Sequence, residues 1–254
     1  MKRFSIVAIA LLLAASSSFA SWDYFPPKDA KEGEAKIGMM YYIPREKSSD
    51  FGLMLGARYT IITGFEASLK LPLPMARTVA DVSLDNQFGL GCPVVGLRYW
   101  VPLVGIGFMG DFVLPVDTRD GTDPKFDMTI GLQYLRGFTP LLKLGSEIRL
   151  ENLVTEGADI DMGLGSELKL NLGIIHPFFG IEWNDLFANN SNTTFDLIMG
   201  AAFPIGDKIS IDASLQLGIA GYKITVIDES TILPQFKEEN ETPMTIRAHI
   251  SYGF

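Results

Sequence analysis

Cysteine and long apolar segments are scarce in this sequence. Cys92 is the one cysteine among 254 residues, so no intrachain disulfide can hold the fold. Beyond residue 20, no apolar run approaches the roughly 18–20 residues that a transmembrane helix needs. The same region shows no sustained 3.6-residue hydrophobic period. These absences argue against a disulfide scaffold, a helical membrane protein and a bundle of amphipathic helices.

Residues typical of enzyme active sites are also few. The sequence has two histidines, His176 and His249, and no GxSxG, HExxH, P-loop or paired-cysteine motif. His249 and Ser251 share a face of the last predicted strand. Positions two apart on a strand are about 6.6–6.8 Å apart, too far for a nucleophile and its base. We therefore predict no catalytic residue and no cofactor, and a hydrolase is the less favoured alternative.

One loop has the composition of a calcium site. DTRDGTD contains Asp117, Asp120, Gly121 and Asp123, and carboxylates are the ligands that calcium prefers. The loop lacks the EF-hand spacing and the distant bidentate glutamate. We interpret it as a solvated loop and predict no metal site.

The N-terminus has the pattern of a secretory signal. MKR precedes an apolar run over 4–15, and Ser18 and Ala20 stand at the two positions that a signal peptidase recognises. Cleavage after Ala20 removes two of the 21 basic residues, which leaves 19 against 30 acidic ones and a net charge of −11. We do not expect so acidic a chain to bind nucleic acid.

Apolar and polar residues alternate over most of the remaining chain. In FDMTIGLQY, residues 126–134, every second residue from Phe126 to Tyr134 is apolar. A period of two indicates a β-strand, because successive side chains leave the strand on opposite faces. About twelve such segments are present. They are 35–43, 50–60, 64–72, 93–101, 104–114, 126–136, 141–152, 160–172, 174–184, 193–203, 208–221 and 243–254.

The connections between these segments alternate in length. Links after the even-numbered segments are short, whereas those after the odd-numbered ones are mostly longer, such as 72–93 and 222–242. This rhythm is typical of an antiparallel up-and-down barrel with two different rims. A β-sandwich would not show it. A soluble barrel with an apolar interior is the other alternative, but about twelve strands would enclose a large dry void. We therefore predict a closed all-β barrel whose apolar face contacts lipid.

The last strand carries the one recognisable motif. Apolar residues occupy alternate positions up to the terminal aromatic residue, with Ala248 small for the pattern: Ile246, Ile250, Tyr252 and Phe254. This strand resembles the C-terminal signature of Gram-negative outer-membrane β-barrel proteins, and the whole chain is similar to their porin-like, transporter-type members of about twelve strands. The resemblance implies recognition of these residues by the barrel assembly machinery, short periplasmic turns and longer extracellular loops.

The resemblance and the pattern together divide the chain. We predict a signal peptide over 1–20, a short flexible periplasmic segment over 21–34 and a transmembrane barrel over 35–254. The protein is then expected in the outer membrane, in contact with lipid and lipopolysaccharide.

Charged residues on the polar face are distributed unevenly. A basic wall is predicted from Arg58, Lys70, Arg98 and Arg247. Acidic residues of the lumen and mouth are predicted to be Asp111, Asp127, Asp161, Glu182, Asp196 and Asp212. A transverse field between these walls would resemble the constriction of general porins. Confined charges are normally paired, so we favour a lumen partly closed by salt bridges.

These features favour a passive channel for small solutes. Carboxylates toward the outer mouth, below acidic loops, predict a mild preference for cations. Three tryptophans are too few for an aromatic path for sugars, so no substrate is predicted. The alternative is a structural or surface-binding barrel, plugged if the apolar loop 72–93 folds inward.

Overall fold

The computed structural model describes residues 30–45, 48–79, 82–83, 87–101, 104–119, 122–155, 160–186, 193–221, 223–228, 235–240 and 242–254. All regular structure in these ranges is β. The long strands are β1 (Gly33–Arg45), β2 (Ser48–Ile62), β3 (Phe65–Val79), β5 (Val94–Val101), β6 (Ile106–Val113), β7 (Asp127–Thr139), β8 (Leu142–Glu151), β9 (Asp161–Leu170), β10 (His176–Asn184), β11 (Thr194–Ile205), β12 (Ile209–Ala220) and β15 (Met244–Gly253). Short elements are β4 (Val82–Ser83), β13 (Lys223–Asp228) and β14 (Gln235–Asn240).

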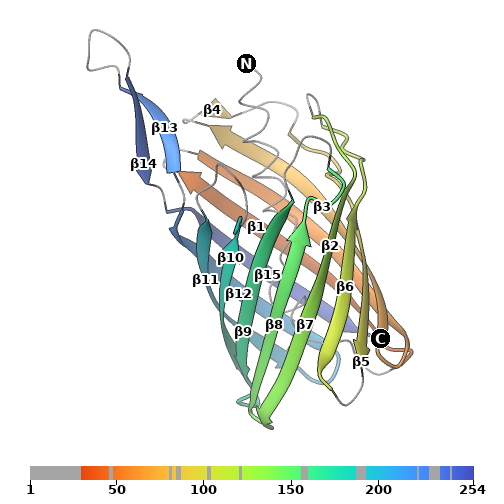
Figure 1. Cartoon of the computed structure of the whole chain (residues 1–254). Coiled ribbons are helices and arrows are strands. Elements are labelled where there is room, and N and C mark those ends of the chain that lie inside the picture. The colour runs from red at the N-terminus through yellow and green to blue at the C-terminus, as the bar shows by residue number, and fades with distance from the viewer. Residues whose placement is uncertain are drawn as a thin grey trace.

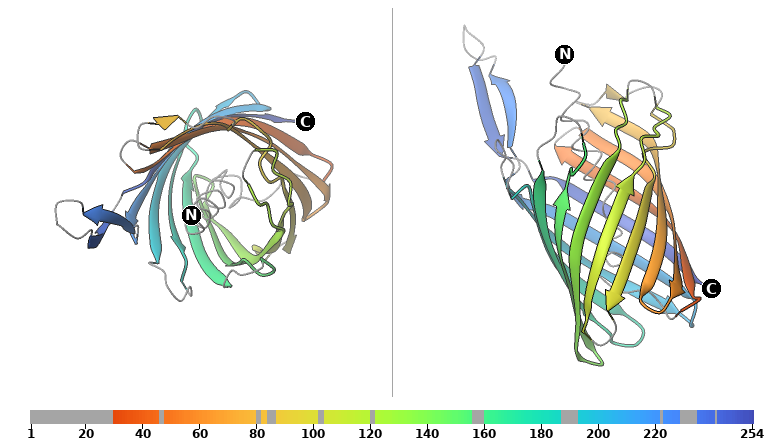
Figure 2. Two further views of the ribbon diagram at one scale, coloured as in Figure 1. Left: turned by 90° about the horizontal axis from the view of Figure 1, so that it is seen from above. Right: turned by 45° about the vertical axis from the view of Figure 1, so that its right-hand side comes forward.

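The long strands form one closed antiparallel barrel. Their order is β2-β1-β15-β12-β11-β10-β9-β8-β7-β6-β5-β3, and β3 pairs back with β2. Figure 1 shows the strands tilted along the barrel, and the view from above in Figure 2 shows them arranged as a ring. The predicted fold class is confirmed, because each of the predicted segments coincides with one strand of this barrel.

The first and last strands form the seam that closes the ring. β1 pairs with β15 from Glu34, opposite Gly253, to Ile43, opposite Met244. Backbone hydrogen bonds extend this ladder by one pair, from Gly33 N to Phe254 O (2.9 Å) and from Phe254 N to Gly33 O (3.0 Å). β1 thus begins at Gly33, two residues before the predicted start of the strand. Residues 1–29, with the predicted signal and most of the predicted periplasmic segment, lie outside the described residues.

The two rims of the barrel differ as the loop lengths predict. Turns at the rim that holds the C-terminus are short, and Gly173 (φ 85°) and Gly206 (φ 65°) take the left-handed conformation there. A Cβ built on either glycine meets nothing, so the backbone angle rather than space favours glycine. At the opposite rim, β13 and β14 form a separate hairpin beyond the barrel (Figure 1). The sequence pattern treated this region, 222–242, as a loop.

β3 is longer than predicted because its prolines do not interrupt the barrel ladder. The predicted strand ended at Pro72, and Pro74 follows two residues later. Their carbonyls accept hydrogen bonds from Gly91 N (2.9 Å) and Gly89 N (3.2 Å). The N–H and C=O of one residue point to the same side of an antiparallel strand, so the missing proline donors face segment 87–93 and not β2.

The described part of the long connection 72–93 lies along the barrel wall. Segment 87–93 pairs with β3 on one side. On the other side it bonds to the residues after β6, through Leu114 N to Pro93 O (2.8 Å) and Thr118 N to Leu90 O (2.9 Å). Phe88 is 70% exposed. In its described residues, this connection therefore extends the wall of the barrel.

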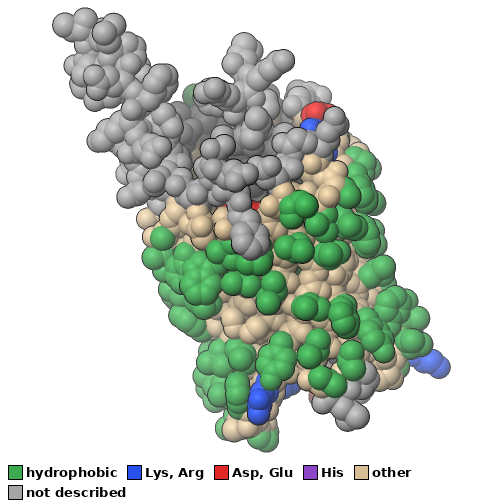
Figure 3. Space-filling view, viewed as in Figure 1, with side chains coloured by type: hydrophobic (Ala, Val, Ile, Leu, Met, Phe, Trp, Pro, Cys, Tyr) green, Lys and Arg blue, Asp and Glu red, His purple; other side chains and the backbone are tan. Residues whose placement is uncertain are grey.

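The apolar side chains cover the outer surface of the barrel. Figure 3 shows hydrophobic side chains spread over the visible face, and the few cationic groups in view lie near its two rims. Neighbouring strands place Ile37, Ile250 and Ile211 side by side, and each is at least 40% exposed. Glu167 and Lys70, in contrast, are 0% and 2% exposed. The molecule is thus inverted relative to a water-soluble barrel. No helix among the described residues is long and apolar enough to cross a membrane.

A charge on the outer face should destabilise the barrel according to its height. Leu132, near the middle of β7, faces outward and is 48% exposed, whereas Leu141 lies in the turn before β8 at the rim and is 56% exposed. We expect Leu132→Lys to cost about 2–4 kcal/mol of unfolding free energy in lipid vesicles, and Leu141→Lys about 0–1 kcal/mol. Urea titration would measure both. Equal costs would contradict a lipid-facing surface at Leu132.

Candidate functional site: the polar interior of the barrel

Hydrogen bonds and ion pairs connect most strands on the inner face. Arg58 on β2 donates to Glu34 on β1 (2.7 and 3.0 Å) and lies 3.8 Å from Glu66 on β3. Arg98 on β5 contacts Ser68 on β3 (3.3 Å) and Asp111 on β6 (3.4 Å). These contacts therefore connect the inner faces of β1, β2, β3, β5 and β6.

Two further chains of contacts involve β15. His249 Nδ1 lies 2.8 Å from Asp212 Oδ1 on β12, whose other oxygen is 3.3 Å from Lys36 Nζ on β1. Nearer the hairpin rim, Arg247 donates to Gln216 (2.6 Å), and Gln216 donates to Asp196 on β11 (2.8 Å). The seam strands are thus joined by side chains as well as by their backbone ladder.

Arg149 on β8 contacts three side chains. Its guanidinium donates to Glu147, to Glu151 (2.7 Å) and to Asn184 on β10 (2.7 Å). Glu147 in turn accepts from Gln133 on β7 (2.9 Å). Such charge-assisted hydrogen bonds are about twice as strong as neutral ones. Arg149 therefore links β8 directly to β10, and through Glu147 to β7.

Glycines make room for these side chains to lie along the wall. A Cβ built on Gly163, between β8 and β10, would lie 3.0 Å from Arg149 Nη2. A Cβ on Gly38 would collide with the His249 ring, and one on Gly96 with Ser68 and Asp111. The long polar groups can therefore cross a neighbouring strand close to its backbone.

The four residues of the predicted basic wall all point inward. Lys70, Arg98 and Arg247 are 2–4% exposed, and the Arg58 side chain is 11% exposed. Arg58 and Arg98 form ion pairs, and Arg247 reaches Asp196 through Gln216. These three bases thus lie beside acids or amides of adjoining strands.

The predicted acidic residues are also on the inner face. Asp127 accepts from Thr155 (2.6 Å), and Asp161 accepts from the backbone N–H of Met162 (2.7 Å). Glu182 is 5% exposed. Asp111, Asp196 and Asp212 take part in the contacts described above. Asp127, Asp161 and Asp196 stand at or near the strand ends that face the hairpin rim.

Some partners were missed by the sequence reasoning. Glu34 and Lys36 of β1 and Asn184 take part in these contacts but were not predicted. The alternation placed Gln133 and Gln216 on the polar face, but their partners were not predicted. Alternation alone could have placed Lys36 inside, because Ile37 and Met39 point outward. Its pairing with Asp212 depends on strand register, which alternation does not give.

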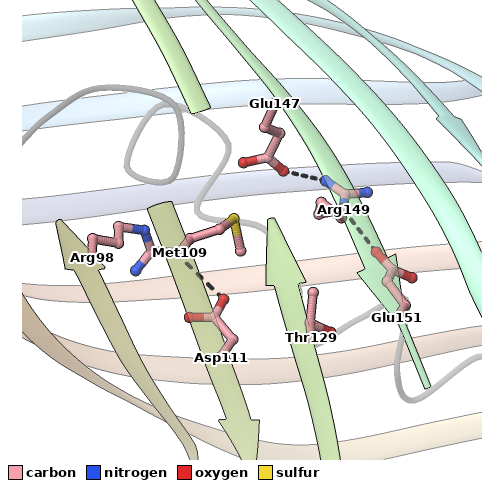
Figure 4. A pocket seen from close by; sticks show the side chains of 7 residues that line it. All are labelled: Arg98, Met109, Asp111, Thr129, Glu147, Arg149 and Glu151. Atoms are coloured by element: carbon pink, nitrogen blue, oxygen red, sulfur yellow. Dashed lines mark hydrogen bonds and ion pairs between the residues drawn. The ribbon is translucent and has the colours of Figure 1, made fainter. Parts of the chain in front are cut away.

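A small cavity of about 50 Å³ lies among these groups (Figure 4). The side chains drawn around it come from β5, β6, β7 and β8. They are Arg98, Met109, Asp111, Thr129, Glu147, Arg149 and Glu151. Two arginines with four acceptor-bearing neighbours give this part of the wall a mixed charge.

Carboxylates gather at the hairpin rim, at or near the ends of the strands. Burial, a hydrogen bond with Asp161 and the charges of Asp161, Glu151 and Asp196 raise the pKa of Asp185 to about 7. Asp185 follows β10 directly and has a left-handed backbone (φ 59°). This acidic mouth, defined here as Glu151, Asp161, Asp185 and Asp196, therefore changes its charge near neutral pH.

The loop that suggested calcium is held by an arginine. Asp117 accepts hydrogen bonds from the Arg119 side chain and from Arg119 N (3.0 Å). Burial acts to raise the pKa of Asp117, but these bonds hold it below its usual range. Asp120 and Gly121 lie outside the described residues. Within the described ranges, no three candidate ligands are grouped to hold a metal.

Comparison with known proteins identifies the fold. No protein-family model matches the chain, and no curated protein matches it in sequence. An outer-membrane channel from Pseudomonas putida F1 matches with a TM-score of 0.62 at 11% identity, over 91% of this chain and 98% of that one. The KdgM porin, in complex with disordered oligogalacturonate, gives 0.54 at 8% identity, over 86% and 99%.

A third solved structure extends the comparison. The translocator domain of the autotransporter NalP from Neisseria meningitidis gives a TM-score of 0.56 at 11% identity, over 98% of this chain and 97% of that one. Each of the three matches covers nearly the whole length of the solved chain. The chain therefore has the fold of outer-membrane β-barrels, a class that includes channels, porins and translocators.

Removing the central arginine should destabilise the barrel strongly. Arg149→Met would leave Glu147 and Glu151 without their cation, and we expect a loss of about 3–5 kcal/mol of unfolding free energy. Arg77→Met is the matched control. Its partner Asp50 is 3.3 Å away, but both side chains are more exposed, so the expected loss is at most about 1 kcal/mol. Urea unfolding in vesicles measures the difference, and equal losses would show that Arg149 does not organise the wall.

Proposed function

We propose that the protein is an outer-membrane channel for the passive diffusion of small polar solutes, with a mild preference for cations. The observation that carries the proposal is the inverted barrel itself: an apolar outer face and ion-paired polar groups inside a closed ring. Solved channels and porins with the same fold support it. No enzymatic role is part of the proposal.

Export and assembly follow the same reasoning. Residues 1–20 act as a secretory signal, and the barrel assembly machinery recognises the last strand. Its four residues of the predicted motif are between 45% and 53% exposed on the outer face: Ile246, Ile250, Tyr252 and Phe254. Outer-membrane lipid and lipopolysaccharide then surround the apolar surface.

The cation preference rests on the acidic mouth. Asp161 and Asp196 face inward. Their charges and that of Glu151 act on Asp185, so the four carboxyl groups lie close to one another. Carboxylates at the entrance of a pore raise the local concentration of cations and lower that of anions. Arg58 and Arg98 of the lumen form ion pairs with acids, so they offset this field only in part.

Reversal potentials test the proposal directly. Purified protein in planar bilayers, under a KCl gradient, should conduct and give a potential of the sign expected for excess K⁺ flux. The double variant Asp161→Asn with Asp196→Asn should move that potential toward zero. Preference for Cl⁻ would contradict the selectivity. Absence of conductance in folded, inserted protein would favour the alternative of a plugged structural or surface-binding barrel.

The selectivity should depend on pH near neutrality. The pKa of Asp185 is about 7, so this residue is mostly ionised at pH 8 and mostly protonated at pH 6. The mouth therefore loses negative charge as the pH falls through 7, and the K⁺ preference should decrease. At both pH values, Asp185→Asn should show the lower K⁺ preference that the wild type shows at pH 6. A wild-type potential that is unchanged between pH 6 and pH 8 would exclude this role.

A further inference from the structure

Glu167 is a buried carboxylate that the polar network does not satisfy. It lies on the inner face of β9, is 0% exposed, and neither of its oxygens accepts a hydrogen bond in the described part of the chain. Glu147, on the adjacent strand, contrasts with it because its two oxygens accept from Arg149 and Gln133. Burial of a carboxyl group without hydrogen-bond donors costs free energy. A ligand that brings a donor to Glu167 would recover part of that cost.

The charges around Glu167 come from several strands. Lys169 on β9, Glu182 on β10, Lys36 on β1 and Asp212 on β12 all act on it electrostatically. Lys36 is already 3.3 Å from Asp212. With Glu167 included, this set holds three carboxyl groups and two lysines.

An apolar patch adjoins this carboxylate on the wall. Gly180 on β10 pairs with Glu167 on one side and with Ile198 of β11 on the other. A Cβ on Gly180 would lie 3.7 Å from Glu167 Cβ and 3.5 Å from Ile198 Cβ, so the two side chains flank this glycine. Ile198 and Phe178 form a buried cluster. Aliphatic and aromatic side chains of the inner face therefore lie on β10 and β11, next to the strand that carries Glu167.

We propose that Glu167, Ile198 and Phe178 form a binding site for the alkylammonium group of a permeating solute. A primary ammonium has the N–H donors that the carboxylate lacks, and charge-assisted hydrogen bonds would join them. The alkyl chain attached to it would pack on Ile198 and Phe178. The proposal rests on the channel function for the route by which the solute arrives, and it names organic amines as the solute class.

Binding to the detergent-solubilised protein tests the site without requiring conduction. Isothermal titration with n-butylammonium chloride should show saturable binding, and Glu167→Gln should weaken it by about tenfold or more. Tetramethylammonium, which has no N–H donor, should bind the wild type no better than it binds the variant. Glu147→Gln is the matched control and should keep wild-type affinity, because the oxygens of Glu147 are already occupied. Heat-modifiable migration on gels verifies folding of each variant.

A second variant separates the two halves of the site. Ile198→Ala should weaken binding of n-butylammonium more than that of methylammonium, since only the longer chain reaches the apolar patch. This comparison still tests the site if Glu167→Gln does not fold. Equal affinity of the wild type and Glu167→Gln, or of butylammonium and tetramethylammonium, would overturn the proposal.

The outcomes also separate this site from the channel function. Conductance in bilayers without Glu167-dependent binding would leave the channel standing and remove the amine site. Glu167-dependent binding by a protein that does not conduct would keep the site and exclude an open channel.

Discussion

The constraint on which the structure depends is that every barrel strand must find a hydrogen-bonding neighbour on both sides. Hydrocarbon offers no water to unpaired backbone groups, so an open edge would be costly there. The ladder between β1 and β15, extended by Gly33 and Phe254, removes the last edge. Once the ring is closed, each side chain must lie either outside or inside it, and the alternating sequence determines which.

The inner face has to satisfy its polar groups within a confined space. Many of these groups are satisfied by long side chains that reach across a neighbouring strand, as Arg149 on β8 reaches Asn184 on β10. Glycines such as Gly163 and Gly38 let these groups lie close to the backbone. The groups that stabilise the interior are therefore the same groups that a solute inside the barrel would meet. A substitution that changes what such a solute would meet also changes the stability of the barrel.

Much of this architecture could be predicted from the sequence because the signals are local. Alternation within each segment and the lengths of the links define the number of strands, their direction and the inward orientation of residues such as Arg98 and Asp212. The prediction failed where local rules gave the wrong boundary. The predicted strand ended at Pro72, yet the missing donors of Pro72 and Pro74 face an irregular segment and β3 continues to Val79. The β13–β14 hairpin was missed because its short strands lie outside the barrel pattern.

Partnerships across the lumen wall were beyond the sequence for a different reason. The contact of Lys36 with Asp212, or the lack of a donor at Glu167, depends on the relative heights of residues on several strands. Those heights follow from register, and a shift of one residue would turn each side chain to the other face. The list of inward residues was therefore accessible, whereas their partners were not.

The seam has a consequence for how the molecule is made. Its two strands lie at opposite ends of the described chain, so the contact between Gly33 and Phe254 spans almost the greatest sequence separation available in the fold. Local hairpins such as β7–β8 can form as soon as both strands have emerged, but the ring can shut only after the final strand is delivered. A nascent chain must consequently remain unsealed, with two bare edges protected from aggregation, throughout its passage to the membrane.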